Sequence, residues 1–539
     1  MRRPADRPTP MTPQPTPLTP MQTPSPTRRP RAGALRTTAV LGAVLAAAAG
    51  CTDLTESPPS SFSPTNFYQN DAQVQSALAG VYNGVRATEG DYWAASQASS
   101  DETIVPTRGT DWLDGGQWQE LWLHTYAPAS GAGNQVLNGA YGSLSTGIAR
   151  ANAVIQSLSS VNTPAAQAGL AEARVLRAWF YFMLQDLFGG VPIITEPGLS
   201  SVPRVTRDST VKFVEAELLA SRAALPATRD AANYGRVTRY SVDAMLSYLY
   251  LNWPVYSGTV TATGLTAGSA RYQDVITRTD SIMNSGNYAL AADSTAWRHN
   301  FAYNNQDSKE SIFVVRNFTA TGLGLDFPHR ALYYNQFTGG GWNGFSMVAE
   351  RYAQFDATDT RRSIFLVGPQ KTLDTNQPLT DGGVAVTITP VITSLEAAAR
   401  NEGVRVYKYP LDPNRVERNN GNDFTVFRYA GVMLDRAEAM WRMGNEAGAR
   451  DILNQIRARV YNPPQPITGA ITADVILHER LNELTNEGKR RTDMIRLGSF
   501  GAPKPFKAGT DAGYQILMPI PLNQRQSNPA LTQNPGYPN

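Results

Sequence analysis

The chain has 539 residues, of which 42% are hydrophobic and 17% charged, and its formal net charge is +3. Its single cysteine excludes an intramolecular disulfide and a zinc site built on clustered cysteines, and its four histidines leave little for a histidine-rich metal centre. The first fifty residues carry seven arginines and one acidic residue, so the rest of the chain is slightly acidic and gives no general case for binding nucleic acid. We therefore expect no metal, no cofactor and no nucleic-acid partner.

Residues 1–50 have the composition of a proline-rich tail followed by a signal peptide. Ten prolines between residues 4 and 30 prevent a helix or a packed core in that stretch. A basic run follows, and residues 39–49 are then uncharged and mostly apolar. Eleven such residues are too few for a membrane span, which needs about 20, but they suit the apolar region of a signal peptide.

Cys51 follows directly on the small residues 48–50, as in a bacterial lipobox. Ala48 departs from that pattern, which usually has leucine three residues before the cysteine. We predict that Cys51 is lipidated and that the Ser/Pro-rich segment 51–66 is a lipidated tether. The alternative is an ordinary signal peptide with an incidental cysteine.

Residues 67–539 are expected to form a single, mostly α-helical domain. Apolar periodicity predicts a helical scaffold over about 67–290 and 425–500, with an irregular region over about 290–425 and a Pro/Asn-rich C-terminal segment at 500–539. Residues 99–132 are expected to be a long loop, and short strands are expected at 312–315 and 404–407. The predicted helices are 70–82, 134–160, 165–188, 208–225, 238–252, 271–285, 425–443, 446–460 and 472–488.

Two helix pairs have the helix–turn–helix pattern of a tetratricopeptide repeat. In the first, apolar stripes at 429–441 and 449–456 flank a turn at Gly444 and Asn445. The second spans 238–285 and is interrupted by a Gly/Thr-rich insertion at 257–270. A few short strands and long irregular insertions complete the expected fold.

Several stretches, taken in order, resemble the SusD/RagB family of outer-membrane lipoproteins. They begin at Cys51 and continue at 171–192, 285–290, 310–313, 428–439, 479–493 and 518–537. One departure is Gly431, where family members often carry an acidic residue.

The resemblance implies a SusD-like fold of tetratricopeptide-like helix pairs, with irregular insertions that build the ligand face. It also implies a cell-surface lipoprotein of the outer membrane, held by its N-terminal lipid. Such a protein captures oligosaccharide, or less often peptide, and delivers it as the lid of a SusC-like TonB-dependent barrel transporter. The resemblance also implies that the protein is not an enzyme.

Glu479, Glu483 and Glu487 stand at i, i+4 and i+8 on one helical face. This spacing could hold a metal or supply the acid pair of a glycoside hydrolase. Because basic residues lie nearby at 480, 489–491 and 496, we favour a structural network of ion pairs.

Aromatic residues are the better indication of a ligand site. Four tryptophans fall between residues 90 and 125, and a flat ring on an exposed loop suits the apolar face of a sugar. Trp118 and Trp122, at i and i+4, are expected to pin this loop to the scaffold. The predicted ligand residues of this first cluster are Trp93, Arg108, Asp111 and Trp112.

A second cluster lies at 333–343, where three consecutive glycines would let the chain bend and expose Trp342. Contact with the transporter and plain loop packing are the rival interpretations. Its predicted ligand residues are Tyr333, Tyr334, Trp342 and Asn343.

Two other classes of protein stay open as alternatives. One is a secreted or surface glycoside hydrolase that uses Asp101, Glu102 or Asp111. The other is a tetratricopeptide-type scaffold that binds only protein partners. No zinc-protease histidine pair, serine elbow or phosphate-binding glycine loop occurs in the sequence.

Overall fold

The structure is a computed structural model that describes residues 68, 70–128, 135–199 and 201–538. The predicted leader, the tether and Cys51 lie outside this part of the chain. Helices dominate the described residues, which confirms the mostly α-helical, SusD-like fold class. Within the described residues, none of the helices combines the length and the apolar character that a membrane crossing requires.

The main helices begin and end where the sequence supplies caps. The Thr163 side chain accepts a hydrogen bond from the Ala166 N–H at the start of α6, and Gly189, at φ +73°, ends that helix. The N-terminal helices are α2 (Asp71–Gly84), α3 (Asp91–Ser99), α4 (Gln117–Leu123), α5 (Gln135–Leu158), α6 (Pro164–Phe188), α7 (Arg207–Arg222), α8 (Arg239–Leu251), α9 (Trp253–Tyr256) and α10 (Tyr272–Met283). The later ones are α11 (Ser294–His299), α12 (Phe327–Ala331), α13 (Ala349–Tyr352), α14 (Tyr429–Arg442), α15 (Glu446–Ala458), α16 (Ala473–Leu484), α17 (Arg490–Arg496) and α18 (Leu522–Ser527).

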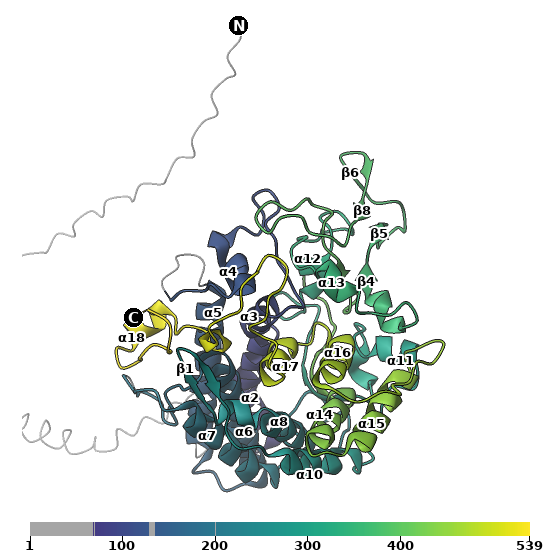
Figure 1. Cartoon of the computed structure of the whole chain (residues 1–539). Coiled ribbons are helices and arrows are strands. Elements are labelled where there is room, and N and C mark those ends of the chain that lie inside the picture. The colour runs from purple at the N-terminus through teal and green to yellow at the C-terminus, as the bar shows by residue number, and fades with distance from the viewer. Residues whose placement is uncertain (1–67, 69, 129–134, 200, 539) are drawn as a thin grey trace, which may run out of the picture. The chain divides into compact units, whose positions relative to one another are not determined.

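Successive helices pack as pairs, as the tetratricopeptide-like pattern predicts (Figure 1). The pairs are α5 with α6, α8 with α10, and α14 with α15, and α10 also packs on α14. Gly444, at φ +85°, makes the turn between α14 and α15, where a side chain would be strained. Met433, Leu453 and Ile456 are buried between these two helices.

The strands are short and pair in twos, all antiparallel, in the part of the chain that is described. They are β1 (Thr259–Thr261) with β2 (Gly264–Thr266), β3 (Ser311–Val315) with β10 (Phe424–Arg428), β4 (Phe365–Leu366) with β9 (Arg405–Val406), β5 (Gly368–Pro369) with β8 (Thr387–Ile388), and β6 (Thr380–Asp381) with β7 (Val384–Ala385). The strands expected near 312–315 and 404–407 are therefore present. The hairpin of β6 and β7 extends from the top of the molecule in Figure 1.

Three local predictions were wrong. Residues 425–428 belong to β10, and α14 begins only at Tyr429, because the Phe424–Arg428 segment is extended and buried against β3. The expected loop at 99–132 contains α4, which buries Trp118 and Trp122 as predicted. Helix α17 was missed because it is short and its buried face carries arginines instead of an apolar stripe.

The C-terminal segment is fastened to the end of α6 by backbone and side-chain hydrogen bonds. The Met518 N–H donates to the Leu187 carbonyl at 2.7 Å. The Asn534 amide donates to the carbonyls of Phe188 at 3.0 Å and Met518 at 2.7 Å. The stretches 171–192 and 518–537, which carry the family resemblance far apart in the sequence, therefore meet in the structure.

A buried network of ion pairs joins α16 to the irregular region and confirms the structural interpretation of the three glutamates. Glu483 is buried and lies 2.9 Å from Arg361 and 2.6 Å from Arg428, and it also pairs with Arg459. Five basic and five acidic residues are linked by these contacts. They are Arg361, Lys408, Arg428, Arg457 and Arg459 with Glu310, Asp359, Glu479, Glu483 and Glu487.

The partners of the three glutamates differ from those that the sequence suggested. Arg480 pairs with Asp435 and Asp493, Arg490 with Asp101, and Arg491 with Asp186. The neighbouring bases therefore pair with other acidic residues, while the cations that neutralise the glutamates come from other elements, among them β10 and α15.

Candidate functional site

Two loops bring the two predicted aromatic clusters together. The first loop runs over 108–116 and the second over 333–344. The Trp112 Nε1–H donates to the Trp342 carbonyl at 2.7 Å, and the two indole rings lie 6.5 Å apart at 46°. Clusters more than 200 residues apart in the sequence thus form one surface.

A tight backbone turn presents Trp112. Arg108 and Asp111 exchange two backbone hydrogen bonds of 3.1 Å, with Gly109 at φ +67° inside the turn. Trp112 itself has φ +62°, an uncommon conformation for a large residue, which directs its ring onto the edges of Trp118 and Phe345. The ring is half-buried, so it is held on one side and open on the other.

The second loop adds Trp342 and Tyr334, which are also half-buried. The Tyr334 hydroxyl donates to the Asp111 carboxylate at 2.5 Å. Burial and this hydrogen bond raise the pKa of Tyr334, so the hydroxyl stays protonated at neutral pH. We call Trp112, Tyr334 and Trp342 the aromatic face.

Gly344 leaves the space that Trp112 occupies. A Cβ at this position would lie 2.2 Å from Cε2 of the Trp112 ring. We expect Gly344→Ala to displace the ring, to weaken ligand binding and to lower the free energy of unfolding by about 1–3 kcal/mol, because overpacking forces neighbours to move. Urea unfolding of this variant beside Gly469→Ala, where a Cβ would meet no atom within 4 Å, measures the effect. Equal stability of the two variants would contradict the expectation.

Four of the predicted ligand residues are buried and support the face instead of forming it. Trp93 is 2% exposed, because its ring stacks on Phe327 with centroids 4.1 Å apart. The Arg108 side chain donates to the carbonyls of Gly344 at 3.1 Å and Glu402 at 2.7 Å, and burial lowers its pKa to about 10.

Asn343 and Tyr333 are the other two corrections. The Asn343 amide oxygen accepts hydrogen bonds from Arg405, and its NH₂ group donates to the Arg400 carbonyl at 2.8 Å. The Tyr333 hydroxyl donates to the Asp381 carboxylate at 2.8 Å, while its ring is buried. Asp111, Trp112, Tyr334 and Trp342 are the predicted ligand residues that reach the surface.

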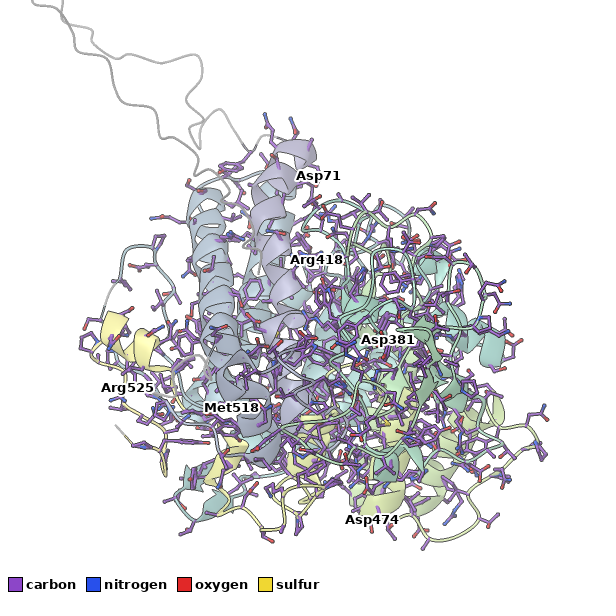
Figure 2. All side chains as sticks on the ribbon, turned by 90° about the horizontal axis from the view of Figure 1, so that it is seen from above. Asp71, Asp381, Arg418, Asp474, Met518 and Arg525 are labelled. Atoms are coloured by element: carbon purple, nitrogen blue, oxygen red, sulfur yellow. The ribbon has the colours of Figure 1, made fainter. Side chains whose placement is uncertain are left out.

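Three charged residues near the face were not singled out from the sequence. Arg400 lies over the Tyr334 ring at 5.3 Å and pairs with Asp381 at 3.1 Å. Arg418 lies 6.0 Å from the centre of the Trp342 ring. Figure 2 labels Arg418 close to α2 and Asp381 in the irregular region. Single charged residues in irregular segments give no spacing signal from which they could have been found.

The carboxylates that a hydrolase would need do not gather at this face. Asp101 is buried, and although burial would raise its pKa, the Arg490 guanidinium at 2.7 Å lowers it. Glu102 is also buried, which raises its pKa to about 7, and it accepts hydrogen bonds from Gln97 and the Asn486 backbone. Among the described residues, no group of three or more His, Cys, Asp or Glu side chains is arranged to hold a metal ion.

The comparisons with known proteins agree on one family. Residues 309–537 match the model of the SusD family, and residues 54–251 match a model described as "Starch-binding associating with outer membrane". A SusD-like protein of Formosa agariphila is 23% identical over 534 residues, which are 89% of this chain and 94% of that protein. The starch-binding protein SusD of Bacteroides thetaiotaomicron is 32% identical over 123 residues, which are 21% of this chain and 22% of that protein.

A solved structure has the same fold. It is a laminarin-binding SusD-like protein with a TM-score of 0.70 and 23% identity, and the match covers 87% of this chain and all of that one. Two family models that together span most of the chain, a relative matched along nearly its whole length and this shared fold lead to one conclusion. The chain belongs to the SusD/RagB family.

Proposed function

We propose that this protein is a non-catalytic, cell-surface lipoprotein that captures oligosaccharide on the aromatic face. It then delivers the glycan, as a lid, to a SusC-like TonB-dependent outer-membrane transporter. The observation that carries this proposal is the pair of half-buried tryptophans, Trp112 and Trp342, in which the Trp112 indole N–H donates to the Trp342 backbone carbonyl at 2.7 Å.

The chemistry of the face suits a sugar ring. The apolar faces of indole rings can stack on the C–H groups of a sugar, as aromatic side chains do at many binding sites. Asp111, Arg400 and Asp381 surround the rings with charged acceptors and donors for hydroxyl groups. The relatives named for starch and laminarin binding make glycan the favoured ligand over peptide.

Association with the outer membrane is supported by the description of the family model that matches residues 54–251. We propose that lipid on Cys51 supplies the anchor, because this is the single cysteine and it follows a signal-peptide-like segment. Mass spectrometry of the membrane-bound protein should find diacylglycerol on Cys51, and Cys51→Ser should release the protein into the soluble fraction.

Calorimetry with laminarihexaose and maltoheptaose, backed by a wider glycan array, tests the ligand proposal. The expected result is saturable binding of at least one glycan with no release of new reducing ends over hours. Turnover of the glycan would favour the hydrolase alternative. Binding of a transporter without binding of any glycan would favour the protein-only scaffold.

A further inference from the structure

A small charged cavity lies beside the aromatic face. Its volume is about 210 Å³, and three segments meet around it: the turn after α2, the loop before α12 and the turn at 416–419. The charged and amide side chains in its lining are Arg86, Glu89, Asp326, Arg330, Arg418 and Asn419.

Two of the three guanidinium groups in this cavity have carboxylate partners. Arg86 pairs with Glu89 at 3.0 Å, and Arg330 pairs with Asp326 at 2.7 Å. Arg418 is exposed and makes no ion pair with any residue that the structure describes, and its guanidinium lies 6.0 Å from the centre of the Trp342 ring. Within the described residues, Arg418 is therefore the one guanidinium of this cavity without a carboxylate partner.

The backbone that carries Arg418 is fixed. Glu417 and Arg418 form a two-residue turn closed by hydrogen bonds of 3.3 and 2.9 Å between Val416 and Asn419. The Asn419 side chain accepts hydrogen bonds from the backbone N–H groups of Gly322 and Gly324, which ties the turn to the loop before α12. The turn thus places the exposed Arg418 between the cavity and the aromatic face.

We propose that the glycan bound on the aromatic face is acidic, and that its carboxylate or sulfate group binds Arg418 at the mouth of this cavity. The inference rests on the proposed function and names the substrate class. An anion there would meet a guanidinium fork, which matches planar and tetrahedral oxyanions, while the attached sugar ring contacts Trp342.

Two acidic residues near Arg418 bear on the binding of an anion. Inside the cavity, burial raises the pKa of Glu89 to about 7, although its partner Arg86 lowers it. Glu417, which is exposed and adjacent to Arg418, is the opposing charge at the mouth. Its removal should therefore strengthen the binding of an anion.

Two matched pairs of probes test the proposal by calorimetry on the whole protein. The first pair is hexagalacturonate and its neutral methyl ester, and the second is sulfated laminarihexaose and laminarihexaose. The expected result is that at least one acidic probe binds about tenfold or more tightly than its neutral counterpart. Which pair shows the preference identifies carboxylate or sulfate as the anion.

Three variants test whether Arg418 causes the preference for the acidic probe. Arg418→Gln should abolish the preference for the acidic probe and leave the affinity for the neutral probe unchanged, whereas Glu417→Gln should increase the preference. Arg150→Gln, which removes the same charge from an exposed site on α5, should change neither. Equal losses in Arg418→Gln and Arg150→Gln would overturn the proposal, because the effect would then be one of net charge.

The failures of the two proposals are distinguishable. Binding of neutral probes with affinity equal to or above that of the acidic ones overturns the acidic-glycan inference and leaves glycan capture standing. Absence of binding to every neutral, uronate-bearing and sulfated member of a glycan array overturns both.

Discussion

Replacing Glu483 with glutamine is expected to lower the free energy of unfolding by about 3–5 kcal/mol, because the change leaves buried guanidinium groups without their counter-charge. The carboxylate contacts three arginines and accepts a hydrogen bond from Trp297 Nε1 at 3.1 Å, all away from water. Glutamine keeps the shape and removes the charge, so a loss of stability reports the electrostatics. Urea unfolding followed by circular dichroism measures it.

A control for this prediction is Lys212→Gln, which breaks an exposed ion pair with Asp208 at 2.7 Å. Exposed pairs contribute about 0.5 kcal/mol or less, so this variant should unfold close to the parent. A loss below about 1 kcal/mol in Glu483→Gln would mean that the buried network is no stronger than a surface pair.

Low pH should lower the stability of the fold by acting on the same network of buried ion pairs. Burial opposes ionisation of Glu483, but Arg459, Arg428 and Arg361 outweigh it and hold its pKa well below the usual range. A depressed pKa in the folded state gives stability that is present above the unfolded pKa of about 4.3 and is lost as the pH falls below it. The parent should therefore lose stability below pH 4.3 more steeply than Glu483→Gln.

Replacing Trp342 with alanine is expected to weaken glycan binding by about 2 kcal/mol, or roughly 30-fold, because the change removes a half-buried indole ring on which a sugar can stack. The change should lower the free energy of unfolding by less than about 1 kcal/mol, since the ring is half-exposed and its backbone contacts remain. Calorimetry with the tightest glycan found for the parent, combined with urea unfolding, separates the two effects.

Trp441→Ala is the matched control. Trp441 is also a half-buried tryptophan, but it lies on α14, where it packs against a separate cluster of buried apolar residues. Its loss should leave glycan affinity unchanged. Unchanged affinity in Trp342→Ala as well would remove this ring from the binding site.

The main helices could be predicted because their signals are local. An N-cap such as Thr163 and a terminating glycine such as Gly189 stand beside the residues that they cap. The start of α14 was misplaced because the competing strand is stabilised by β3, more than 100 residues earlier. The partners of Glu483 were missed for the same reason, since Arg361, Arg428 and Arg459 come from other elements.

The candidate site was predictable in part. Trp93 and Trp112 were predicted as ligand residues on the same ground, because both are aromatic residues in or near a stretch with the composition of a loop. Their different exposure depends on packing: Trp93 stacks on both Phe327 and Phe345 and is buried, whereas Trp112 meets the edge of Phe345 and stays half-buried. Such differences in exposure arise from tertiary packing, which no spacing in the sequence encodes.

The hydrogen bond between Trp112 and Trp342 has a consequence for how binding specificity could be exchanged between relatives. Trp112 lies in the region matched by one family model and Trp342 in the region matched by the other. In a chimaera that joins the N-terminal half of one relative to the C-terminal half of another, the residue at position 112 would come from one parent and the residue at position 342 from the other. Gly344 would then have to accommodate a foreign ring, so the two loops must be transplanted together to carry their ligand with them.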